Sequence, residues 1–115
     1  METNWLYVCV ETLLESYSKY EDLQRRTVTQ FSMLLEFLVA ERLLIGDLKE
    51  WKNKEIKSLR IFASDLTDEG KTLFSPPVNA YFKWLAANGR DTRKPISMRS
   101  LMNGLKKVRN HSPNA

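Results

Sequence analysis

The sequence has little of what several protein classes require. Its 115 residues include one cysteine, which cannot form an internal disulfide, and four glycines and four prolines, too few for a low-complexity chain. The most apolar stretch, residues 31–45, is interrupted by Glu36, Glu41 and Arg42, so it does not form a membrane-spanning run. The first residues carry an acid and no basic run, so we expect no signal peptide. These absences favour a cytoplasmic protein.

The patterns that accompany catalysis or metal binding are also missing. His111 is the one histidine, and no acid lies near it in sequence to orient it as a general base. Cys9 falls among apolar residues, which favours a small core residue over a reactive thiolate. Asp65, Asp68 and Glu69 are explained by the start of a helix more simply than by a Mg²⁺ site. The glycines are scattered, with no phosphate-binding loop. We expect no enzyme, no cofactor and no metal.

The residues that are present favour one small helical domain. A hydrophobic content of 43%, with 10% aromatic residues, is enough to build a core. We predict a single domain over residues 1–109 and a flexible tail over 110–115. Charge is uneven, because residues 1–48 hold 4 Lys/Arg against 8 Asp/Glu and residues 49–115 hold 14 against 6. Such a distribution bears on partners and on association rates rather than on fold.

Apolar residues recur at helical spacing along most of the chain. Thr27 and Gln30 form a capping-box pattern before a Leu- and Phe-rich run, which predicts the helix at the centre of the core. Residues 44–48 suit a short strand. Residues 49–63 fit either a helix or a hairpin that turns at 52–54, and we slightly favour the hairpin. The predicted class is therefore mostly α, with about five helices and a small β-hairpin. The five helices are expected over 4–18, 27–43, 67–74, 76–88 and 97–109, and residues 20–26 suit a short additional helix.

The order of these elements resembles a winged-helix domain. In that family a helix-turn-helix precedes a two-stranded wing, and a Leu-Thr-Asp/Glu-Glu-Gly segment leads from the wing into a helix. Residues 20–44 match the helix-turn-helix with its turn at Thr27, and residues 66–70 read Leu-Thr-Asp-Glu-Gly. The resemblance covers about residues 4–74, with Glu41-Arg42 where the family has glycine.

The winged-helix resemblance implies DNA binding through the second helix of the motif. That helix would enter the major groove and present polar side chains to bases and phosphates. Residues 28–41 contain no Lys or Arg, however, and Glu36 would be repelled by phosphates. A DNA-binding regulator is therefore the alternative hypothesis. Its contact residues would be Arg25, Arg26, Thr29, Gln30, Ser32, Lys52, Lys54 and Lys57.

The chain also resembles bacterial immunity proteins, including those of contact-dependent growth inhibition systems. The resemblance lies in residues 66–70, in Phe-Lys-Trp-Leu at 82–85 followed by Asn-Gly-Arg-Asp at 88–91, and in residues 101–109. It implies a cytosolic, non-enzymatic protein that binds one toxin and blocks it. This is the leading hypothesis, and aromatic and basic residues would anchor the interface. The candidates are Trp51, Lys54, Lys57, Tyr81, Trp84, Arg90 and Arg93.

Two alternatives remain open within the leading hypothesis. Large aromatic residues are mostly buried in small domains, so Trp51 and Trp84 are equally well explained as core residues. A homodimer through the helix over 31–43 is suggested by analogy with small winged-helix proteins alone.

Overall fold

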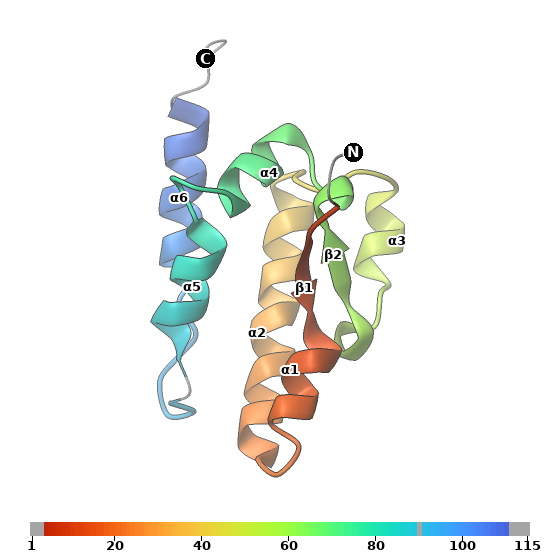
Figure 1. Ribbon diagram of the computed structural model, residues 1–115, viewed down its shortest axis with the longest axis vertical. Helices are drawn as coiled ribbons and strands as arrows, with labels where there is room; N and C mark the ends of the chain where they lie inside the picture. Colours follow the sequence, from red (N-terminus) through yellow and green to blue (C-terminus); the bar gives the residue numbers. More distant parts are fainter. Residues whose placement is uncertain (1–3, 90, 111–115) are drawn as a thin grey trace. The chain divides into compact units, whose positions relative to one another are not determined.

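The computed structural model describes residues 4–89 and 91–110 (Figure 1). Its contacts divide the chain into two compact units, Met1–Thr67 and Asp68–Ala115. The residues described form six α-helices and one two-stranded antiparallel sheet, which confirms the predicted class of a mostly helical chain with one small strand pair. In this part of the chain no helix has the length and apolar character needed to cross a bilayer.

The first unit is built around one long helix. Strand β1 (Leu6–Cys9) leads into α1 (Val10–Ser16), and α2 (Glu21–Ala40) follows. Helix α3 (Leu48–Lys52) and strand β2 (Arg60–Phe62) come next, with β1 and β2 running beside α2 in Figure 1. Two short 3₁₀ turns, Ile56–Ser58 and Ala63–Asp65, flank β2. The core of this unit is formed by buried apolar side chains that include Val8, Phe31, Leu34, Leu38 and Ile61.

The strand pair does not form as the sequence pattern predicts. Residues 52–54 do not turn a hairpin, because α3 ends at Lys52 and the chain reaches β2 through a 3₁₀ turn. The partner of β2 is β1, with Val8 opposite Ile61 and Cys9 opposite Arg60, so the start of the predicted 4–18 helix is a strand instead. Val8 and Ile61 are both fully buried. Burial in this long-range pair outweighs the helical spacing of the apolar residues.

Helix α2 is continuous where a helix-turn-helix was expected. Thr27 lies inside the helix, and its Oγ1 donates to the Leu23 carbonyl at 2.7 Å instead of capping a new helix. This intrahelical bond satisfies the buried hydroxyl without a turn. The predicted short helix over 20–26 and the long helix after Thr27 are therefore one element. The prediction that this region supplies the core is confirmed, since Phe31, Leu34 and Leu38 are buried.

The segment after α2 reverses direction and starts α3. Leu44 forms an isolated antiparallel bridge with Leu66, in place of the short strand expected at 44–48. Gly46 has a φ of +97°, a backbone conformation that glycine adopts without steric cost. Asp47 then caps α3 by accepting a hydrogen bond from the Lys49 amide at 2.8 Å.

The second unit contains three helices, α4 (Asp68–Phe74), α5 (Ala80–Asn88) and α6 (Arg99–Asn110). Asn88, at the end of α5, is buried and holds the start of α6 in place. Its Nδ2 donates to the Trp84 and Ser97 carbonyls at 2.8 and 3.0 Å, and its Oδ1 accepts from the Ser97 amide at 2.7 Å. Phe82 and Met102 are more than half exposed.

Candidate functional site

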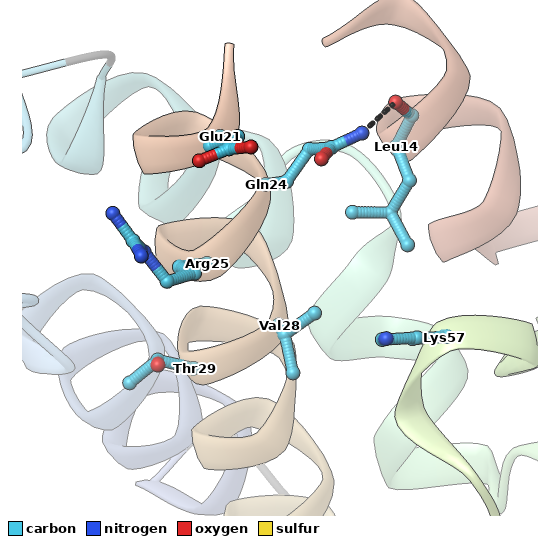
Figure 2. A pocket seen from close by; sticks show the side chains of 7 residues that line it. All are labelled: Leu14, Glu21, Gln24, Arg25, Val28, Thr29 and Lys57. Atoms are coloured by element: carbon cyan, nitrogen blue, oxygen red, sulfur yellow. Dashed lines mark hydrogen bonds between the residues drawn. The ribbon is translucent and has the colours of Figure 1, made fainter. Parts of the chain in front are cut away.

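Two hollows lie on one face of α2 in the first unit. The first, of about 670 Å³, lies between α1, α2 and the 3₁₀ turn Ile56–Ser58 (Figure 2). The second, of about 760 Å³, lies between the C-terminal half of α2, α3 and residues 54–56, and we call it the basic groove. The first hollow is lined by Leu14, Glu21, Gln24, Arg25, Val28, Thr29 and Lys57. The basic groove is lined by Ser32, Leu35, Glu36, Val39, Ala40, Arg42, Leu48, Lys52, Lys54 and Ile56.

Helical spacing explains why these side chains share a face. Ser32, Leu35 and Val39 follow one another at intervals of three and four residues, which places them on one side of α2. Leu48 and Lys52 are four residues apart on α3 and line the groove together. Leu35 and Val39 are buried, while Ser32 is half-buried. The groove therefore has an apolar floor between two helices.

Positive charge surrounds this apolar floor. Arg42, Lys52 and Lys54 line the basic groove and are exposed, and Glu36 is its one acidic residue. The Nζ of Lys54 lies 5.1 Å from the centre of the Trp51 ring, a cation–π contact. Trp51 is buried and its Nε1 donates to the Ile45 carbonyl at 2.8 Å, so the ring is fixed beneath the lysine. The cation–π contact therefore holds the Lys54 ammonium group at the edge of the groove.

The first hollow has a different character. Gln24 Nε2 donates to the Leu14 carbonyl at 3.2 Å and so links α1 to α2, as Figure 2 shows. Glu21 and Arg25 lie on one edge and Lys57 on the other, with Val28 between them. Arg25 also pairs with Asp22 on the surface of α2. Two cations and one acid line this hollow, whereas three cations and one acid line the basic groove.

The structure brings some of the predicted interface residues together. Lys52, Lys54 and Ser32 line the basic groove. Lys57, Arg25 and Thr29 line the first hollow. All six belong to the DNA-contact set of the alternative hypothesis, and Lys54 and Lys57 belong to the protein-interface set as well.

Other predicted interface residues are buried. Trp51, Tyr81 and Trp84 belong to the core, so the core interpretation of the aromatic residues is the correct one. Burial raises the pKa of the Tyr81 phenol above its ordinary value. Gln30 is buried on α2 and does not reach the surface where a base could be read.

Two further predicted residues lie outside the two hollows. Arg26 is half-buried on α2. Arg93 is exposed and pairs with Asp91, its Nε lying 3.1 Å from the Asp91 Oδ1. Arg90 lies outside the described residues, as does His111.

The sequence did not single out Arg42 or the apolar floor. Arg42 was noted only as a break in the apolar stretch and at the place where the winged-helix family has glycine, and its place in the groove depends on how α2 ends. Leu35 lies in the Leu- and Phe-rich run that was expected to supply the core, and Val39, Leu48 and Ile56 were not assigned a role. These apolar residues come together because α3 packs against α2, and no local sequence pattern predicts that packing.

The thiol of Cys9 lies beside Thr12 at the start of α1. Cys9 is half-buried rather than part of the core, and its Sγ is hydrogen-bonded to the Thr12 Oγ1 at 3.2 Å. Hydrogen bonds from the Thr12 hydroxyl and amide lower the pKa of the Cys9 thiol below 9.0, partial burial opposes them, and Arg60 across the strand pair adds to the lowering. Among the described residues no three His, Cys, Asp or Glu side chains gather as metal ligands.

Comparison with protein-family models, with curated proteins and with solved structures finds no match to the chain. The winged-helix and immunity-protein resemblances therefore rest on their sequence motifs. The chemistry of the basic groove is the strongest indication of function that the described residues offer.

Proposed function

We propose that this protein is a non-enzymatic binding module that holds a protein partner at the basic groove. The observation that carries the proposal is an apolar floor of Leu35, Val39 and Leu48 framed by the exposed cations Arg42, Lys52 and Lys54. Protein interfaces commonly combine an apolar centre with a polar rim. A small polar metabolite would make few favourable contacts with these apolar side chains, whereas apolar side chains of a partner would cover them and exclude water.

The partner we propose is a toxin that the module occludes in the cytoplasm. The sequence resemblance to immunity proteins supports this role. The basic groove supports it too, because a cluster of like charges accelerates capture of an oppositely charged partner. Inhibition by occlusion needs no catalytic group on the inhibitor.

Co-expression with the product of the adjacent reading frame tests the proposal. We expect a stable complex on size-exclusion chromatography with light scattering, and restored growth of cells that express the neighbour. Lys52→Glu/Lys54→Glu, called the groove variant, should weaken the complex at least tenfold. Lys19→Glu/Arg60→Glu, called the control variant, replaces exposed cations that line neither hollow and should leave it intact. Absence of a complex, or equal loss in both variants, would contradict the proposal.

Duplex DNA is a second candidate partner, favoured by one observation. Arg42, Lys52 and Lys54 lie in a groove that Ser32 also lines, which places three cations beside a predicted base-reading residue. Glu36 in the same groove opposes phosphate binding. A duplex-binding protein should lose affinity steeply as salt rises, with a slope of about −0.9 per phosphate contacted. A gel shift at low salt that disappears in the groove variant would support DNA binding, and no shift would exclude it.

A further inference from the structure

We infer that the segment of the partner held in the basic groove is an amphipathic α-helix whose flanking side chains are acidic. This inference rests on the proposed function and specifies what the groove recognises. It follows from three features of the groove, namely the backbone that borders it, the spacing of its apolar floor and the sign of the charges on its rim.

The backbone around the groove favours a helical occupant. An extended peptide gains affinity by adding to an open strand edge, where backbone groups are free to pair. The groove is bordered instead by α2, α3 and residues 54–56, and neither strand contributes a lining residue. Backbone groups within a helix are bonded to one another. A helical occupant satisfies its own backbone in the same way and needs only side-chain contacts from the groove.

The floor sets the length and spacing of the contact. Ser32 to Ala40 spans nine residues of α2, and the rise from the first to the last is about 12 Å or two helical turns. Leu35 and Val39 lie one turn apart, and Leu48 and Ile56 face them from the other wall. A helix lying along this floor would bring side chains spaced by three or four residues against it. The matching segment therefore has apolar residues at positions i, i+3, i+4 and i+7.

The rim sets the charge of the flanking residues. Arg42, Lys52 and Lys54 are exposed around the floor, against the single acid Glu36. The contact of Lys54 with the Trp51 ring keeps one of these charges at the groove. Acidic side chains beside the apolar positions would meet these cations, and basic ones would be repelled. Complementarity thus selects Asp and Glu on the flanks of the bound helix.

Selection from a display library tests the inference. The probe is a phage library of randomised peptides of about 16 residues, long enough to form a helix when bound. We expect enriched sequences with apolar residues at i, i+3, i+4 and i+7 and an excess of Asp and Glu. A synthetic copy of the most enriched peptide should become helical on binding by circular dichroism. Its affinity should fall at least tenfold in the groove variant and less than twofold in the control variant, as measured by calorimetry.

Several outcomes would overturn the inference. These are enriched peptides without net acidity, peptides that bind in extended form, no enrichment at all, and equal binding to both variants. A further contrary outcome is a dimer of this chain that the groove variant converts to monomer, since a second copy would then occupy the groove. A toxin complex that the groove variant disrupts, together with any of the first three outcomes, would reject the inference and leave the proposed function standing. Absence of any toxin complex with the unaltered protein would reject the proposed function.

Discussion

At the scale of single residues, Arg42 departs most clearly from what its sequence position favours. Its φ of +56° lies in the left-handed region, which costs a side chain other than glycine about 1 kcal/mol. The Arg42 amide donates to the Val39 carbonyl at 3.1 Å and the Leu43 amide to the Leu38 carbonyl at 2.9 Å, the Schellman arrangement that usually has glycine at this place. The same arginine lines the basic groove. We interpret the strain as stability given up for a cation beside the apolar floor.

Replacing this arginine should separate stability from binding. Arg42→Gly relieves the left-handed strain but adds flexibility to the unfolded chain, so we expect the free energy of unfolding to rise by about 0.5 kcal/mol. Arg42→Ala keeps the left-handed strain, so we expect no rise in its free energy of unfolding. Both variants lose the cation and should bind an acidic helical peptide about threefold more weakly. Urea unfolding and calorimetry measure the two effects. A fall in stability for Arg42→Gly, or unchanged binding in both variants, would contradict this interpretation.

At the scale of elements, the sequence predicts what depends on local pattern. The stripe of Phe31, Leu34 and Leu38 marks α2, and the acids Asp68 and Glu69 mark the start of α4, because each signal lies within one helix. The residues of β1 also have helical spacing, but they pair with a strand about 50 residues away. No local pattern records that pairing. The predicted start at Thr27 fails for a related reason, because its hydroxyl serves equally well inside a helix.

In the candidate site, too, some features have a local sequence signal and others depend on how the elements pack. Lys52 and Lys54 were predicted as surface cations because lysine is seldom buried, and they line the groove. Trp51 was placed among interface anchors by residue type, yet it supports Lys54 from within the core. The floor and the role of Arg42 arise from helix packing and backbone conformation. Sequence therefore identified two of the three cations on the rim, and it missed Arg42 and the apolar floor.

The packing of α6 depends on a glycine in its middle. A Cβ placed on Gly104 would lie 2.4 Å from the Ala80 Cβ and 3.1 Å from the Leu73 Cδ1, so α6 approaches α5 and α4 more closely than alanine allows. In an exposed helix, alanine in place of glycine would add about 1 kcal/mol of stability. At this position the overlap should outweigh that gain.

We therefore expect Gly104→Ala to lower the free energy of unfolding by about 2 kcal/mol. Thermal unfolding followed by circular dichroism would show a midpoint lower by several degrees. Asn103→Ala is the matched control, because Asn103 is exposed on the same helix and its change should leave the midpoint unchanged or slightly higher. A higher midpoint for Gly104→Ala would show that α6 can shift to accept the methyl group.

At the scale of the whole molecule, net charge and local charge make different predictions. The chain carries a formal net charge of +4, with its excess of Lys and Arg after residue 48. If net charge governs association with an acidic partner, replacing any pair of exposed cations should slow association equally. If the basic groove governs it, only cations within about 8 Å of the contact should matter at physiological salt, because that is the screening distance. The groove and control variants separate these cases, since each lowers the formal net charge from +4 to 0.

The rate at which an acidic helical peptide associates should depend on the charges at the basic groove. Stopped-flow fluorescence at about 0.15 M salt should show an association rate roughly tenfold lower in the groove variant and less than twofold lower in the control variant. The difference should nearly vanish at about 1 M salt, where screening shortens to about 3 Å. Equal loss in both variants would mean that net charge steers the partner. A groove-specific loss that persists at high salt would mean that Lys52 and Lys54 act through close contact rather than through their field.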